Sequence, residues 1–145
     1  MAFDFDVGSV ILIDKPYQWT SFDVVNKVRC LIKNHKQIKK IKIGHAGTLD
    51  PLATGLLILC TGSYTKKIDE YQGMEKEYTG TFVLGATRPS YDKETEIDNT
   101  FDISTITEDQ IYQVAKTFVG NSNQVPPQYS AKKINGERAY ESARK

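Results

Sequence analysis

The chain has 145 residues, which is enough for one domain with a real core but not comfortably for two. Its 39% hydrophobic and 26% charged residues are typical of a globular protein, and no apolar run approaches the roughly 20 residues of a membrane-spanning helix. Acidic residues and no basic ones precede Lys15, whereas a signal peptide begins with Lys or Arg. We therefore expect a cytoplasmic protein without a membrane segment.

Positive charge is concentrated in one part of the chain. Residues 15–67 carry ten Lys or Arg and only two Asp, whereas residues 1–14 and 68–145 both have an acidic excess. Such an asymmetry indicates an anionic partner, with nucleic acid as the first candidate. A solvated lysine-rich face is the alternative, and composition leaves both open.

The beginning of the chain predicts a strand followed by a helix. The apolar run at residues 10–13 is bounded by Gly8 and Pro16, which is typical of a short buried strand. Thr20 or Ser21 is available as the N-cap of the next helix. The expected core face of this helix repeats at helical spacing and consists of Val25, Val28, Leu31 and Ile32.

The middle of the chain predicts further strands and a short helix. We expect a short strand at residues 41–43, a buried strand at 56–60 and a helix over 64–71. In residues 75–84 the side chains fall alternately on two sides, one mostly aromatic or apolar and the other mostly polar, which predicts a strand with one exposed face. The residues on one side of this strand would be Tyr78, Gly80, Phe82 and Leu84.

The last third predicts a loop, a well-marked helix and two more elements. Residues 86–105 are polar and aperiodic, which favours a loop with at most one short strand. The capping box at residues 107–110 and the apolar spacing after it predict a helix that ends near Gly120. A strand over 129–134, a tight turn and a helix over 137–145 follow. This order of elements predicts an α+β fold with a mixed sheet.

Asp50 is the candidate for chemistry. It lies in a stretch at residues 44–55 that is rich in Gly and Pro and leads into a buried strand, a setting that holds a polar side chain rigidly. An isolated Asp can act as a nucleophile or a general base, although Asp before Pro is also ordinary turn chemistry. No nucleotide-binding or serine-hydrolase motif is present. Cys30 and Cys60 fit no metal or disulfide spacing, so we expect both to be buried and predict no metal site.

A family resemblance rests mainly on residues 44–57, GHAGTLDPLATGLL. This stretch closely resembles the signature of the TruB family of tRNA pseudouridine synthases. Residues 12–16 are similar to that family's first conserved block. Residues 76–78 resemble its strand that runs from a basic residue to a tyrosine, and Tyr78 follows Asp50 at the expected spacing of 28 residues. Residues 126–140 resemble the RNA-clasping loop of the bacterial branch.

The resemblance implies a fold, a reaction and a set of site residues. The pseudouridine synthase fold has a mixed, mainly antiparallel sheet flanked by helices, and the implied reaction isomerises uridine to pseudouridine at position 55, in the T arm of tRNA. Asp50 would be the nucleophile or base, Tyr78 would pack against the flipped base, and His45 would hold the everted nucleotide. The implied reaction uses no metal or cofactor. The residues that would support or bind the T stem-loop are Lys15, Gly44, Asp92, Lys39, Lys40, Lys42 and Lys132.

The resemblance also implies a longer protein. Members of the family continue beyond this point, with a later block that supplies a basic partner for the catalytic Asp. Residues 1–145 would then be the N-terminal portion of a single catalytic domain, with an incomplete sheet and an end within the RNA-binding loop. We expect such a chain to be inactive or poorly stable by itself. A non-catalytic RNA-binding fragment or paralogue is the alternative function.

Overall fold

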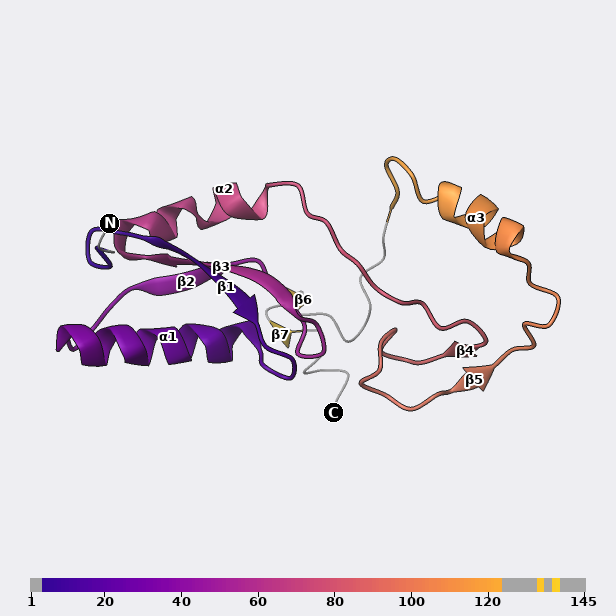
Figure 1. Cartoon of the computed structure of the whole chain (residues 1–145), viewed down its shortest axis with the longest axis horizontal. Helices are drawn as coiled ribbons and strands as arrows, with labels where there is room; N and C mark the ends of the chain where they lie inside the picture. The colour runs from indigo at the N-terminus through magenta and orange to yellow at the C-terminus, as the bar shows by residue number, and fades with distance from the viewer. Residues whose placement is uncertain (1–3, 124–132, 135–136, 139–145) are drawn as a thin grey trace. The chain divides into compact units, whose positions relative to one another are not determined.

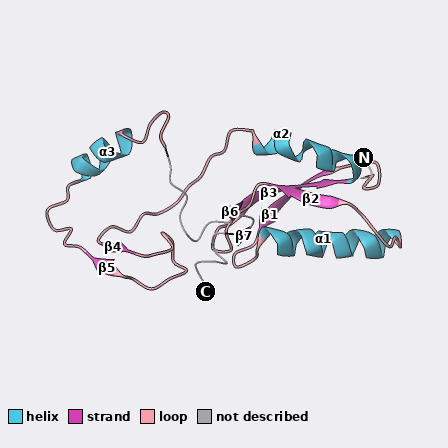
Figure 2. Ribbon diagram, turned by 180° about the vertical axis from the view of Figure 1, so that it is seen from behind, coloured by secondary structure: helices cyan, strands magenta, loops and turns pink. Residues whose placement is uncertain are grey.

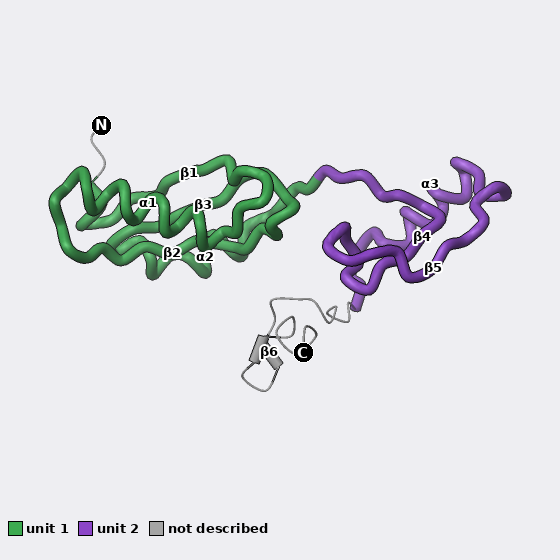
Figure 3. Tube along the Cα trace, turned by 90° about the horizontal axis from the view of Figure 1, so that it is seen from below, with its two compact units in different colours: residues 1–78 green, residues 79–145 purple. Residues whose placement is uncertain are grey.

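The computed structural model describes residues 4–123, 133–134 and 137–138 (Figure 1). The chain divides into two compact units, residues 1–78 and 79–145 (Figure 3). Helices and antiparallel strands occur together, which confirms the predicted α+β class (Figure 2). Among the described residues, no helix is both long enough and apolar enough to cross a membrane.

The first unit is a small antiparallel sheet with helices on both faces. The strands lie in the order β1-β3-β2, and both neighbouring pairs are antiparallel. Helix α1 covers one face and helix α2 lies over the other (Figure 1). The elements of this unit are β1 (Val10–Lys15), α1 (Ser21–Lys36), β2 (Ile43–Ala46), β3 (Gly55–Thr61), the 3-10 helix η1 (Gly62–Lys67) and α2 (Ile68–Gln72).

Helix α1 begins with a reciprocal capping box. The Thr20 hydroxyl accepts a hydrogen bond from the backbone N–H of Asp23 at 3.0 Å, and the Asp23 carboxylate accepts one from the Thr20 N–H at 2.9 Å. These two bonds satisfy N–H groups that have no partner within the helix. Of the two predicted capping residues, Thr20 therefore caps the helix, and the Ser21 hydroxyl is left for another partner.

The hydrophobic core lies between α1 and the sheet. Its buried members are Val24, Val25, Ile32, Ile43, Leu57 and Leu59. Two predicted positions are wrong, because Leu31 is 56% exposed and Cys30 is also exposed. Cys30 lies on a side of α1 that turns away from Val24 and Val25, since each residue advances the helix by about 100°. Leu31 is seven residues after Val24 and shares its face, but it is left exposed two turns farther along the helix. Cys60 is buried as predicted, and this burial raises the pKa of its thiol.

The strands and short helices of this unit match the sequence prediction with shifted ends. The predicted strands at 10–13 and 56–60 are confirmed as β1 and β3, and each is longer than predicted. The strand predicted at 41–43 begins instead at Ile43, so β2 contains the first part of the Gly-rich stretch. The helix predicted over 64–71 consists of the 3-10 helix η1 followed by α2.

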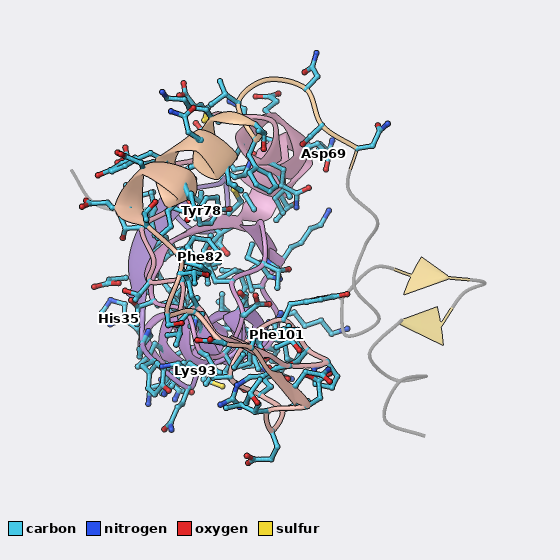
Figure 4. All side chains as sticks on the ribbon, turned by 90° about the vertical axis from the view of Figure 1, so that its right-hand side faces the viewer. His35, Asp69, Tyr78, Phe82, Lys93 and Phe101 are labelled. Carbon is cyan, nitrogen blue, oxygen red and sulfur yellow. The ribbon has the colours of Figure 1, made fainter. Side chains whose placement is uncertain are left out.

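Residues 75–84 do not form the predicted strand. The structure assigns no helix or strand to this segment, in which Tyr78 and Phe82 are labelled in Figure 4. The side chains of these two residues are 73% and 93% exposed. Alternating side chains indicate only that a segment would have two different faces. A strand also needs a partner for its backbone hydrogen bonds, and no described strand pairs with this segment.

The second unit contains two short antiparallel strand pairs, β4 with β5 and β6 with β7, together with helix α3. The segment predicted as a loop thus holds two short strands rather than at most one. Of the strand predicted over 129–134, only the last two residues are described, and they form β6. The elements are β4 (Ala86–Thr87), β5 (Asn99–Thr100), α3 (Glu108–Lys116), β6 (Lys133–Ile134) and β7 (Glu137–Arg138).

The ends of the predicted C-terminal helices differ from the structure. The capping box of α3 is confirmed, with hydrogen bonds of 2.8 and 3.3 Å between Thr107 and Gln110. This helix ends at Lys116, and Gly120 follows it with a positive φ of 98°. The helix predicted over 137–145 is wrong at its start, where β7 forms instead, and its remainder lies outside the described residues.

Adjacent leucines of β3 test which face of the sheet forms the core. Leu57 is 1% exposed, whereas Leu56 is 63% exposed. We expect Leu57→Ala to lower the free energy of unfolding by about 2–4 kcal/mol, because the truncation leaves a cavity among packed side chains. Leu56→Ala should cost less than about 1 kcal/mol. Urea denaturation measures both values, and equal losses would contradict the assignment of the core face.

Candidate active site

Asp50 lies in a defined turn between β2 and β3. The backbone N–H of Ala53 donates to the carbonyl of Asp50 at 3.0 Å, which closes the turn. Gly47 and Gly55 flank it with φ angles of +97° and +126°, a region in which a Cβ atom meets the backbone. The Gly and Pro pattern of the sequence therefore corresponds to a turn with restricted backbone at both ends.

The turn is anchored to the segment that precedes α1 and to its first residue. Ser21 is 3% exposed, and its hydroxyl accepts from the Leu49 N–H at 3.0 Å and donates to the Leu49 carbonyl at 3.3 Å. On the other side of Asp50, the Pro51 carbonyl accepts from the Gln18 N–H at 2.8 Å. Hydrogen bonds between the β1–α1 loop and the β2–β3 loop thus fix both neighbours of Asp50.

A buried lysine joins the same two loops. Lys15 is 0% exposed, and its ammonium donates to the carbonyl oxygens of Trp19 at 2.6 Å and Pro16 at 3.0 Å. It also reaches the carbonyl of Pro51, at 3.5 Å. An ammonium has three protons to donate, so these backbone oxygens take the place of water around it.

Charge and burial act on Lys15 in opposite directions. Removal from water disfavours the ammonium and lowers the Lys15 pKa, while the nearby Asp50 carboxylate works against this shift. Asp50 is therefore close enough for its charge to act on Lys15. Its own carboxylate is exposed, so it remains accessible to a substrate. Such a carboxylate can accept hydrogen bonds, remove a proton or act as a nucleophile.

The register of the sheet explains why the two loops meet. Lys15 at the end of β1 lies opposite Gly55 at the start of β3. In an antiparallel pair these two ends are adjacent, so the loop that leaves β1 and the loop that enters β3 emerge together. Long-range strand pairing and the Lys15 ammonium therefore determine where Asp50 lies.

His45 and Gly44 lie on β2, just before the turn. The His45 Nδ1 atom is 2.6 Å from the Gly47 carbonyl, which can only accept, so this nitrogen carries the proton and donates it. The imidazole is thereby oriented toward the residue at which the turn begins. A Cβ atom at Gly44 would lie 2.8 Å from Cδ1 of Ile68, so this glycine allows close packing against α2. The predicted contacts of both residues with RNA remain predictions.

Other predicted site residues lie outside this network of hydrogen bonds. Tyr78 is the last residue of the first unit, and its side chain is exposed (Figure 4). Asp92 belongs to the second unit, where its carboxylate accepts from the Glu94 N–H at 2.8 Å. The contact of Tyr78 with the flipped base and that of Asp92 with RNA stay predictions. Lys39, Lys40 and Lys42 are exposed between α1 and β2, and Lys132 lies outside the described residues.

The structure changes the interpretation of Lys15 and adds Ser21 and Gln18 to the site. Lys15 was a predicted RNA-supporting or RNA-binding residue, and its burial argues against direct contact with RNA. The sequence indicates Ser21 only as a possible N-cap and does not predict its contact with the turn that holds Asp50. Asp23 provides the signal that could have resolved this, since it lies three residues after Thr20 and completes that capping box. Across the described part of the chain, no three His, Cys, Asp or Glu residues gather as they would around a metal ion.

Replacing Lys15 tests its anchoring role. Lys15→Met should lower the free energy of unfolding by about 2 kcal/mol at pH 7, because buried carbonyls lose a charged donor. The exposed Lys27 provides a control, and Lys27→Met should change stability by less than about 0.5 kcal/mol.

The difference in stability between the wild type and Lys15→Met should also depend on pH, in a direction that the Lys15 pKa determines. Because folding lowers the Lys15 pKa, the folded state loses this proton before the unfolded state does as the pH rises toward the ordinary value of 10.5. The stability of the wild type relative to Lys15→Met should therefore increase with pH in this alkaline range. Parallel urea titrations measure the difference, and a decrease would contradict the proposed environment of Lys15.

Comparison with known proteins connects this site to a family. A family model described as the N-terminal domain of TruB family pseudouridylate synthase matches residues 33–145. A protein of Flavobacterium johnsoniae named tRNA pseudouridine synthase B is 59% identical over 138 residues, covering 94% of this chain and 60% of that protein. A protein of the same name from Parabacteroides distasonis is 54% identical over 142 residues, covering 98% of this chain and 60% of that protein.

A relative from Chlorobium chlorochromatii carries the same name and is 49% identical over 138 residues, covering 95% of this chain and 53% of that protein. The chain thus spans about 60% of the length of the first two relatives. The match to the family model extends over most of the sequence and includes the turn that holds Asp50. This chain therefore belongs to the TruB family of pseudouridylate synthases.

Proposed function

We propose that the protein containing this chain isomerises uridine to pseudouridine in tRNA, with the T arm as its target and Asp50 as the catalytic carboxylate. The observation that carries the proposal is the exposed Asp50 side chain on a turn anchored by Lys15, Ser21 and Gln18. The names of the relatives support the reaction and its tRNA substrate. A cytoplasmic location would give such an enzyme access to tRNA.

The proposed reaction balances within the uridine itself. The bond between N1 of the base and C1′ of the ribose breaks, the base rotates, and a bond forms between C5 and C1′ while the C5 proton leaves and N1 gains a proton. No electrons are gained or lost overall. Asp50 either attacks the nucleotide or removes a proton, and both roles need a carboxylate held at a fixed position. We leave these two roles open.

The surroundings of Asp50 suit a base that has left its stack. Chemistry on a stacked base requires its extrusion into a pocket, where an exposed carboxylate can reach it. We propose that Tyr78 packs against the flipped uracil and that His45 supports the everted nucleotide. The hydrogen bond from His45 to Gly47 supports this role, because it fixes the imidazole beside the start of the catalytic turn.

The basic segment supplies the proposed electrostatic contacts with RNA. Lys39, Lys40 and Lys42 are exposed, so their ammonium groups are free to approach phosphates. We assign Lys15 a different task from these lysines, because its ammonium is buried and bound by carbonyls. Its proposed task is to position the backbone beside Asp50. Gly44, Asp92 and Lys132 remain proposed RNA-binding residues.

We further propose that residues 1–145 are the N-terminal portion of a single catalytic domain. The greater length of the relatives and the N-terminal-domain description of the family model support this proposal. A non-catalytic RNA-binding fragment or paralogue is the alternative. The exposed carboxylate in its anchored turn favours catalysis, since phosphate binding alone has no use for an acidic group there.

Asp50→Asn tests the catalytic proposal and separates it from the alternative. The amide can neither remove a proton nor act as a carboxylate nucleophile, so we expect pseudouridine formation to fall at least about 1,000-fold while RNA affinity changes less than about threefold. Pseudouridine content of a T-arm RNA measures activity. Asp69→Asn, at an exposed acid of α2, is the control and should retain activity. Undiminished turnover in Asp50→Asn would remove Asp50 from the mechanism.

Tyr78→Leu tests the proposed contact with the flipped base. Loss of aromatic stacking costs about 1–3 kcal/mol, so turnover should fall about 5- to 150-fold. Tyr112 on α3 is also exposed, at 60%, and Tyr112→Leu should leave turnover nearly unchanged. Steady-state kinetics on the same RNA measures both variants, and equal effects would argue against a specific role of Tyr78.

A further inference from the structure

The loop that anchors Asp50 carries two aromatic side chains that the proposed reaction leaves unused. Tyr17 and Trp19 lie between β1 and α1, and they are 56% and 38% exposed. Trp19 is the single tryptophan of the sequence. Aromatic rings carry much of the apolar surface that a protein can bury, so two partly exposed rings on one short loop suggest a binding role.

Hydrogen bonds connect the backbone of this loop to the catalytic turn. The Trp19 carbonyl is 2.6 Å from the Lys15 ammonium, which also reaches the Pro51 carbonyl at 3.5 Å. Gln18 lies between the two aromatic residues, and its N–H donates to Pro51 at 2.8 Å. The segment that carries both rings is therefore fixed to the residue that follows Asp50.

The conformation of the loop is itself restricted. The backbone N–H of Trp19 donates to the Pro16 carbonyl at 3.3 Å, and Gln18 has a positive φ of 66°. A left-handed conformation costs a residue with a side chain on the order of 1 kcal/mol, so the surrounding bonds must maintain it. Trp19 is 38% exposed, so more than half of its surface is already covered in the fold. A ring held in this way loses little entropy when a ligand stacks on it.

We propose that Tyr17 and Trp19 form a stacking platform for an unpaired base of the RNA, next to the uridine that Asp50 acts on. This inference rests on the proposed function. Proteins bind single-stranded RNA loops by stacking bases on aromatic side chains, whereas phosphates are bound by basic residues. The excess of lysine and arginine in residues 15–67 suits the phosphates of the same RNA. The platform would hold a neighbouring nucleotide while the target base enters the site.

Kinetics of two Trp19 variants in the intact protein test the platform. Trp19→Leu keeps an apolar side chain but removes the ring, and we expect it to raise KM for a T-arm RNA hairpin about 5- to 30-fold. The turnover number kcat should change less than about threefold, because the reacting groups stay in place. Trp19→Phe retains a ring and should change KM by less than about threefold.

Fluorescence provides a measurement that needs no catalysis. Stacking of a base on the indole should quench the emission of Trp19 when the hairpin is titrated into the wild type. The same titration of Trp19→Phe records the signal of any other tryptophan and is subtracted. This measurement also remains informative if Trp19→Leu fails to fold. Emission of Trp19 that does not respond to bound RNA would overturn the platform and indicate that other parts of the protein cover the ring.

Phe22 supplies the matched control. It is 60% exposed and lies in the first turn of α1, one residue beyond the Ser21 contact. Phe22→Leu should leave KM unchanged, and an equal increase in both leucine variants would assign the effect to general loss of aromatic surface and overturn the platform. An unchanged KM in Trp19→Leu would overturn it even where Asp50→Asn abolishes activity. Absence of pseudouridine with the wild type would instead overturn the proposed function.

Discussion

The site depends on one buried ammonium, that of Lys15. Its hydrogen bonds join the loop after β1 to the loop before β3, and these loops meet because Lys15 pairs with Gly55 in the sheet. The pairing brings the backbones together, and the ammonium then holds them through carbonyl oxygens. A neutral side chain could not donate three hydrogen bonds from one atom. Asp50 is therefore positioned by backbone groups on either side of it, while its carboxylate stays exposed.

This arrangement separates two uses of positive charge within one basic segment. The exposed lysines between α1 and β2 are available to an anionic partner, whereas Lys15 has exchanged water for protein oxygens. Burial without partners would be costly for an ammonium, and both the carbonyls and the Asp50 charge reduce that cost. The count of basic residues in the sequence cannot distinguish these uses, because both contribute the same formal charge.

Local signals in the sequence predicted the elements that depend on local interactions. The capping box before α3 and the apolar runs of β1 and β3 appear in the structure where their patterns indicated. The strand expected over residues 75–84 failed for a physical reason, since alternation defines faces but supplies no partner for the backbone. The prediction for Leu31 failed because periodicity defines a helix face but not how far along the helix that face is covered: Leu31 shares the face of the buried Val24 and is nevertheless exposed.

The candidate site shows the same division between local and long-range information. Glycine and proline around Asp50 are local turn chemistry, and they were sufficient to single out this carboxylate. The burial of Lys15 depends on contact with Pro51, 36 residues away, and the role of Ser21 depends on Leu49, 28 residues away. No pattern within one segment encodes such contacts. Prediction from sequence therefore singled out the carboxylate that we propose to react, whereas the groups that hold its turn became visible only in the structure, where the two loops lie together.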